Sequence, residues 1–116
     1  MKENTVEDLL GLSFAPADLF AIIAWSEEAA RWGVTTDIET AAEAFQELLC
    51  VTLADADEPA FALWTTPGGL YCLEDYRPMR RGGVSVETTY ANLGMAFRAI
   101  ETAIAKCGRA LRRVAV

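Results

Sequence analysis

A seam of apolar residues runs through the last third of the chain. From Val86 to Val114, apolar side chains follow one another at alternating spacings of four and three residues. This 3.5-residue period places them along one side of an α-helix. The pattern therefore predicts a long C-terminal helix over about residues 86–113, against which the rest of the chain would pack.

Two shorter helices are predicted in the first third of the chain. Thr5, followed three residues later by Asp8, forms a capping-box pattern that indicates a helix over about residues 5–11. Pro16 suits the first turn of a second helix, over about residues 16–32, because an N–H at that position has no partner within the helix.

A third helix is predicted over about residues 37–51. Apolar residues in this stretch recur at i, i+3, i+4, i+7, i+10 and i+11, the spacing that lines one face of a helix. They are Ile38, Ala41, Ala42, Phe45, Leu48 and Leu49.

A β-hairpin is predicted over about residues 60–75, where the pattern changes to alternation. From Phe61 to Thr65 successive side chains would point to opposite faces of a strand. Residues 66–69 read Thr-Pro-Gly-Gly, a turn in which proline presets φ and glycine permits positive φ. Taken together, the elements predict an α+β fold in a single domain spanning residues 1–116.

Charge is distributed unevenly along the chain. The formal net charge is −7, and 53% of the residues are apolar. Residues 1–58 carry thirteen acids and two bases, whereas residues 59–116 carry four acids and eight bases. Such an asymmetry bears on the choice of partner rather than on the fold.

The acids of the first half suggest a binding surface. Glu39, Glu43 and Glu47 recur every four residues on the predicted third helix, and like charges at this spacing cost a helix about 0.2–0.5 kcal/mol per pair. With Asp55 and Asp57 in the following loop, they would form a negative surface for a protein partner with a basic surface. The alternative is that these acids only keep an apolar-rich protein soluble.

Several kinds of chemistry are disfavoured by composition. The chain has no histidine, so the usual neutral-pH general base and histidine metal ligands are missing. Its three cysteines are widely spaced, and it has no phosphate-binding glycine motif. We therefore expect no enzymatic activity, no cofactor and no metal site.

Direct DNA binding and membrane insertion are not expected either. Residues 27–36 have the outline of a helix-turn-helix, but the helix predicted to follow carries acids and no base, which would repel phosphates. The longest apolar run, Leu19–Trp25, is too short to span a bilayer, and the first eight residues do not resemble a signal peptide. A cytoplasmic location is expected.

Two further features have open interpretations. Arg77, Arg80 and Arg81, in a glycine-containing loop, could hold an anion or contact a partner. The seam of the long helix could be entirely core, or part of it could pair with a second copy in a homodimer. The dimer seam would then consist of Leu93, Gly94, Phe97, Ile100 and Ile104.

The sequence supports one leading function and two alternatives. The leading hypothesis is a small acidic, non-catalytic protein that binds a basic protein surface, such as an inhibitor that occupies a nucleic-acid-binding site in the manner of phage anti-defence proteins. The first alternative is a dimeric accessory subunit or chaperone-like adaptor that binds through an apolar surface. The second is a small-molecule pocket near Trp64, Tyr71 and Tyr90.

Overall fold

The computed structural model describes residues 13–41, 46–54 and 56–115, so the helix predicted over residues 5–11 lies outside the described part. The described chain is one helix, five strands and a second helix, with a short 3-10 helix before the last strand. In order these elements are α2 (Pro16–Ala30), β1 (Thr35–Ala41), β2 (Gln46–Thr52), β3 (Phe61–Thr65), β4 (Tyr71–Asp75), η1 (Arg77–Arg81), β5 (Val86–Tyr90) and α3 (Leu93–Ala115).

The five strands form one antiparallel meander in the order β1-β2-β3-β4-β5. Its register aligns Leu49 of β2 with Leu63 of β3, and Leu63 with Leu73 of β4. All three leucines are buried, and they define the face that points into the core. Because successive side chains of a strand alternate, the neighbouring residues point to the opposite face.

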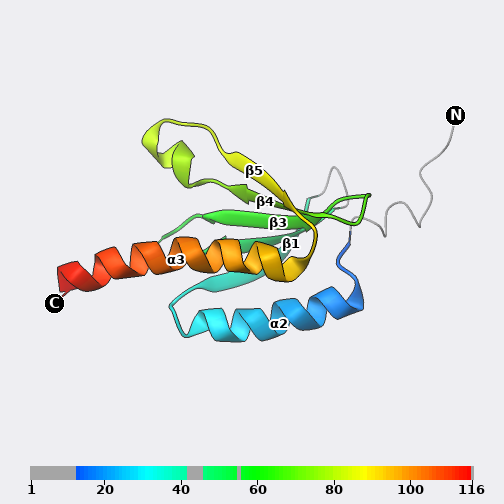
Figure 1. The fold of residues 1–116 in the computed structure, drawn as a ribbon, viewed down its shortest axis with the longest axis horizontal. Coiled ribbons are helices and arrows are strands. Elements are labelled where there is room, and N and C mark those ends of the chain that lie inside the picture. Colours follow the sequence, from blue (N-terminus) through cyan, green and yellow to red (C-terminus); the bar gives the residue numbers. More distant parts are fainter. Residues whose placement is uncertain (1–12, 42–45, 55, 116) are drawn as a thin grey trace, which may run out of the picture.

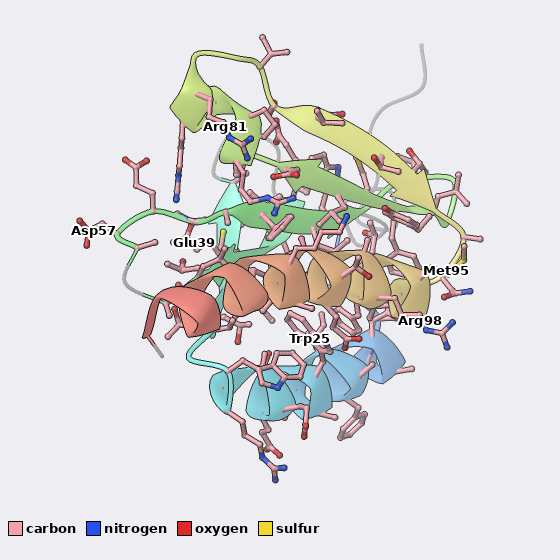
Figure 2. All side chains as sticks on the ribbon, turned by 60° about the vertical axis from the view of Figure 1, so that its left-hand side comes forward. Trp25, Glu39, Asp57, Arg81, Met95 and Arg98 are labelled. Atoms are coloured by element: carbon pink, nitrogen blue, oxygen red, sulfur yellow. The ribbon has the colours of Figure 1, made fainter. Side chains whose placement is uncertain are left out.

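Both helices lie on the leucine side of the sheet (Figure 1). The indole of Trp25 in α2 stacks on the ring of Phe97 in α3, with centroids 4.6 Å apart and planes nearly parallel. Its Nε1 donates a hydrogen bond of 2.9 Å to Glu101 Oε2, also in α3. Figure 2 shows Trp25 between the two helices, so α2 and α3 form a single layer over one face of the sheet.

The predicted helix over residues 37–51 is wrong. Its described parts belong to strands β1 and β2, which pair antiparallel from Thr35 opposite Thr52 to Ala41 opposite Gln46. Four successive apolar residues, Leu48 to Val51, fit a strand packed on both faces as well as a helix. The pairing of β2 with β3 at the centre of the sheet decides between the two.

The predicted start of the long helix at residue 86 is also wrong. Val86 to Tyr90 form edge strand β5, and α3 begins at Leu93. Asn92 caps the start of α3, because its Oδ1 accepts a hydrogen bond of 2.9 Å from the Met95 N–H. Val86 and Tyr90 are four residues apart, so they share one face of a strand as readily as one face of a helix. The 3.5-residue spacing of apolar residues therefore continues from β5 into α3 and does not reveal where the strand ends and the helix begins.

The fold class and the other secondary-structure predictions that fall on described residues are confirmed. The fold class is α+β, and the hairpin of residues 60–75 is present as β3 and β4. Thr66 N–H donates to the Leu70 carbonyl at 2.8 Å, and Gly69 takes a φ of +80° in the turn. The helix predicted over residues 16–32 is present as α2, two residues shorter at its C-terminal end.

Candidate functional site

The sheet face that points away from the helices is apolar in the middle and acidic towards both edges. Its strand residues come from all five strands, and Ala62 and the two cysteines among them are buried. By register and alternation they include Asp37 and Glu39 of β1, Leu48 and Cys50 of β2, Ala62 and Trp64 of β3, Cys72 and Glu74 of β4, and Glu87 and Thr89 of β5. We call this surface the open face.

A groove of about 640 Å³ lies on the open face next to η1. Its floor includes Leu48 and Ala62 of the sheet, and Met79 of η1 contributes to its wall. Glu39 and Glu58 add two carboxylates to the lining, and Arg80 adds one guanidinium. The groove thus offers an apolar floor with negative charge beside it, which suits the apolar stem and cationic head of lysine or arginine.

The two cysteines of the open face are held in the thiol form. Cys50 Sγ lies 3.6 Å from Glu39 Oε2, and Cys72 Sγ lies 3.8 Å from Glu87 Oε1. Burial, followed by the charge of the neighbouring glutamate, raises the pKa of each thiol to about 11. Because the thiolate is the reactive form, neither cysteine is a nucleophile at neutral pH.

A polar group flanks the groove at the end of β4. Ser85 Oγ donates a hydrogen bond of 2.7 Å to Glu74 Oε2. Burial and a hydrogen bond to Glu74 raise the pKa of the Tyr76 hydroxyl to about 12. Tyr76 therefore stays protonated and serves as a hydrogen-bond donor rather than as a base.

The predicted acidic stripe does not exist as a stripe. Glu39 is exposed on the open face, whereas Glu47 points to the opposite, helix-covered face and accepts the Phe14 N–H at 2.9 Å. A single helix or a single strand would put Glu39 and Glu47 on one side. They lie on the paired strands β1 and β2, and the register of this pair sends them to opposite faces. Glu43 and Asp55 lie outside the described residues. Asp57 is exposed in the loop after β2 (Figure 2).

The three loop arginines do not converge on an anion site. Arg77 makes a double hydrogen bond to Asp75, at 2.9 and 2.8 Å, and its guanidinium lies 4.9 Å from the centre of the Phe61 ring. Arg80 Nη2 donates to the Glu58 carbonyl at 3.0 Å, which ties η1 to the loop before β3. Arg81 is exposed at the end of η1.

The residues predicted as a dimer seam are placed in the chain's own core or beside it. Leu93, Phe97 and Ile100 are buried against the sheet and α2, and Ile104 packs partly buried against the same cluster. Gly94 is exposed on the other side of α3. This part of the helix has its apolar face covered by the rest of the chain.

The suggested small-molecule pocket is not assembled. Trp64 belongs to the open face, whereas Tyr71 pairs with Tyr90 on the helix-covered face. The Tyr71 hydroxyl donates to the Asp18 carboxylate at 2.9 Å. The three aromatic residues therefore do not line one cavity.

The sequence interpretation missed the contributions of Asp37 and of Trp64, Tyr76 and Met79 to the open face. Asp37 and Glu39 are two residues apart, and in a strand this spacing puts them on one face. The run of β-branched residues around Asp37, Thr-Thr-Asp-Ile-Glu-Thr, was the available signal for a strand there.

These features define a class of architecture: an antiparallel meander with two helices on one face and a carboxylate-rimmed apolar groove on the other. No protein-family model, no curated protein and no solved structure matches the chain. Within the described ranges, no cluster of three or more cysteine, aspartate or glutamate side chains could hold a metal ion. Neither of the two described helices is long and apolar enough to cross a membrane.

Proposed function

We propose that this protein is a small non-catalytic protein-binding protein that docks a basic surface of its target on the open face. The binding residues are then the acids of β1 and of the loop before β3, chiefly Asp37, Glu39, Asp57 and Glu58. Occupation of a nucleic-acid-binding surface would make it an inhibitor, because carboxylates on its surface take the place of phosphates.

The observation that carries this proposal is the composition of the open face. Among the described residues, the strand carboxylates of this face and Glu58 of the groove together number five, and Arg80 is the one cation in the groove lining. The five are Asp37, Glu39, Glu58, Glu74 and Glu87. A predominantly negative surface of this kind attracts cations and speeds the association of a basic partner.

The chemistry of the face also agrees with binding rather than catalysis. Both open-face thiols are protonated at neutral pH, and the Tyr76 hydroxyl is as well. Among the described residues of this face, the two thiols and the phenol therefore supply no activated nucleophile at neutral pH.

The proposal is tested by affinity capture with two matched charge reversals. Glu39→Lys changes the net charge by the same amount as Glu28→Lys, and both side chains are exposed. The wild type should retain basic nucleic-acid-binding proteins at low salt and release them as the salt rises. Glu39→Lys should strongly reduce this retention, whereas Glu28→Lys should preserve it.

A competing oligonucleotide supplies the second measurement. If the partner uses one surface for nucleic acid and for this protein, the oligonucleotide should displace it from the immobilised protein. Retention of the partner by the Glu39→Lys, Glu58→Lys double variant, with an unchanged far-UV circular dichroism spectrum, would reject the open face as the docking site.

The second candidate is a dimeric accessory subunit or chaperone-like adaptor that binds its partner through an apolar surface. It is favoured by Phe20 and Ile23 of α2, whose side chains are 75% and 55% exposed. Binding through these residues would change little with ionic strength, which separates it from docking on the acidic face. Sedimentation at micromolar concentration tests the dimer.

A further inference from the structure

Strand β1 is an edge of the sheet, and its outer backbone groups can be assigned. Thr66 N–H donates to Leu70, and Tyr76 N–H donates to Ala60, so the even-numbered residues of β3 bond to β4. Alternation then makes the odd-numbered residues of β3 and β2 bond to each other, and the even-numbered residues of β2 bond to β1.

The same alternation fixes β1 itself. Even-numbered residues of β2 pair with odd-numbered residues of β1, such as Cys50 with Asp37 and Leu48 with Glu39. The N–H and C=O groups of Thr36, Ile38 and Thr40 therefore point away from the sheet. Among the described strands β1 has β2 as its single neighbour, so these groups are available to another strand.

An apolar groove runs beside this edge on the helix-covered side. It has a volume of about 530 Å³ and lies between α2 and β1. Ile22, Ile23 and Ile38 line it, and the Ile23 and Ile38 side chains are 55% and 38% exposed. Glu27 of α2 adds a carboxylate to the lining. The buried Ser26 Oγ in its lining has no hydrogen-bond partner among the described residues. A strand added to β1 would place every second side chain over this groove.

The opposite side of the same edge is acidic. Asp37 and Glu39 are exposed there, two residues apart on the open face. Side chains of an added strand that do not face the groove would lie beside these two carboxylates. The edge therefore selects a strand in which apolar residues alternate with basic ones.

The acids also count against a second copy of this chain as the added strand. An antiparallel pair of β1 strands must match outward-facing residues with outward-facing residues, so its two-fold axis falls at a residue. Axes at Asp37, Ile38 or Glu39 each put two carboxylates directly opposite one another, which destabilises the pair. A partner strand with lysine or arginine opposite these carboxylates would form favourable charge pairs, whereas a second copy would place like charges opposite one another.

We infer that β1 captures an extended segment of the partner by strand addition, and that this segment alternates apolar and basic residues. The inference rests on the proposed function, since it names the kind of segment that a basic partner presents. Backbone hydrogen bonds to Thr36, Ile38 and Thr40 hold the segment. Its apolar side chains fill the groove beside α2, and its cations lie beside Asp37 and Glu39.

The test uses a synthetic peptide of alternating lysine and valine, as long as the 7 residues of β1. Hydrogen exchange of the protein, followed by NMR, should slow at the Thr36, Ile38 and Thr40 amides when this peptide is added. The Asp37 and Glu39 amides, already bonded to β2, should change little. A peptide of alternating glutamate and valine should leave all five amides unaltered.

Two matched pairs identify the contacts. A lysine–valine peptide methylated on alternate backbone nitrogens keeps its charge and side chains but loses the donors, and it should bind at least about tenfold more weakly. On α2, Ile23→Asp alters the groove, whereas Phe20→Asp places the same charge outside the residues that line it. Only Ile23→Asp should weaken binding of the lysine–valine peptide, again by about tenfold.

Equal binding of the methylated and unmethylated peptides would overturn strand addition, while loss of partner binding in Glu39→Lys, Glu58→Lys would still support the open face. Glu58→Lys separates the two sites, because Glu58 lines the open-face groove and does not belong to β1. Slowed exchange at the three amides, together with unchanged partner binding by Glu58→Lys, would support the edge and reject the groove of the open face. A dimer of the free protein in which the same three amides are protected would overturn the choice of a basic segment as the occupant.

Discussion

Replacing Trp25 by alanine should remove much of the protein's stability, because this side chain joins the two helices that cover the sheet. Trp25 is 7% exposed, stacks on Phe97 and donates to Glu101. Large aromatic to alanine changes in cores cost about 3–5 kcal/mol, and a stacked aromatic pair contributes about 0.5–1.5 kcal/mol beyond its buried area. We expect a loss of about 4 kcal/mol from a domain whose total is about 5–15 kcal/mol.

Urea unfolding followed by far-UV circular dichroism measures this loss. With a slope of about 2 kcal/mol per molar urea, the midpoint should fall by about 2 M. Phe20→Ala is the matched control, since Phe20 lies on the same helix with 75% of its side chain exposed, and it should change the free energy of unfolding by no more than about 0.5 kcal/mol. Trp25→Phe keeps an aromatic ring but loses the hydrogen bond, and it should fall between the two.

A Trp25→Ala midpoint within the range of the Phe20→Ala control would refute the reasoning. It would mean that α2 is not held against α3 by this contact. The assignment of both helices to one face, which leaves the other face for binding, would then lose its main packing support.

Two further predictions concern titration. The hydrogen bonds from Arg77 hold the pKa of Asp75 below its ordinary value of 3.8. The ionised Asp75 therefore stabilises the folded protein above pH 3.8, and this contribution is lost as the pH falls through the folded-state pKa. Asp75→Asn should therefore flatten the acid limb of a plot of urea midpoint against pH, and an unchanged limb would contradict the pairing. In a Cys107→Ser background, Cys50 and Cys72 should react slowly with a thiol reagent at about pH 8 and rapidly in denaturant, since burial raises both pKa values to about 11. Equal rates in the native and denatured protein would contradict this.

The sequence predicted best where the signal is local. The turn at residues 66–69 needs proline and glycine for its own backbone angles, and it defined the hairpin around it. Pro16 marked the beginning of α2 for the same kind of reason. The apolar residues of α3 from Leu93 onwards follow a period long enough to identify a helix.

The candidate site could not be predicted in the same way, because it depends on which strands become neighbours. Glu39 and Glu47 have a spacing that one helix would turn into a single stripe, but the pairing of β1 with β2 sends them to opposite faces. The apolar floor of the groove comes from β2 and β3, and part of its wall comes from η1. Residues from three separate stretches meet there only after the meander has formed.

The sequence alone therefore determined the fold class, the hairpin, the first described helix and most of the last one. Tertiary structure decided that residues 35–52 are strands, that α3 starts after residue 92, and which acids share a face. The physical reason is that a helix satisfies its backbone within one segment, whereas a strand needs hydrogen bonds from another part of the chain. Apolar spacing over a few residues fits either state, so the partner strand makes the choice.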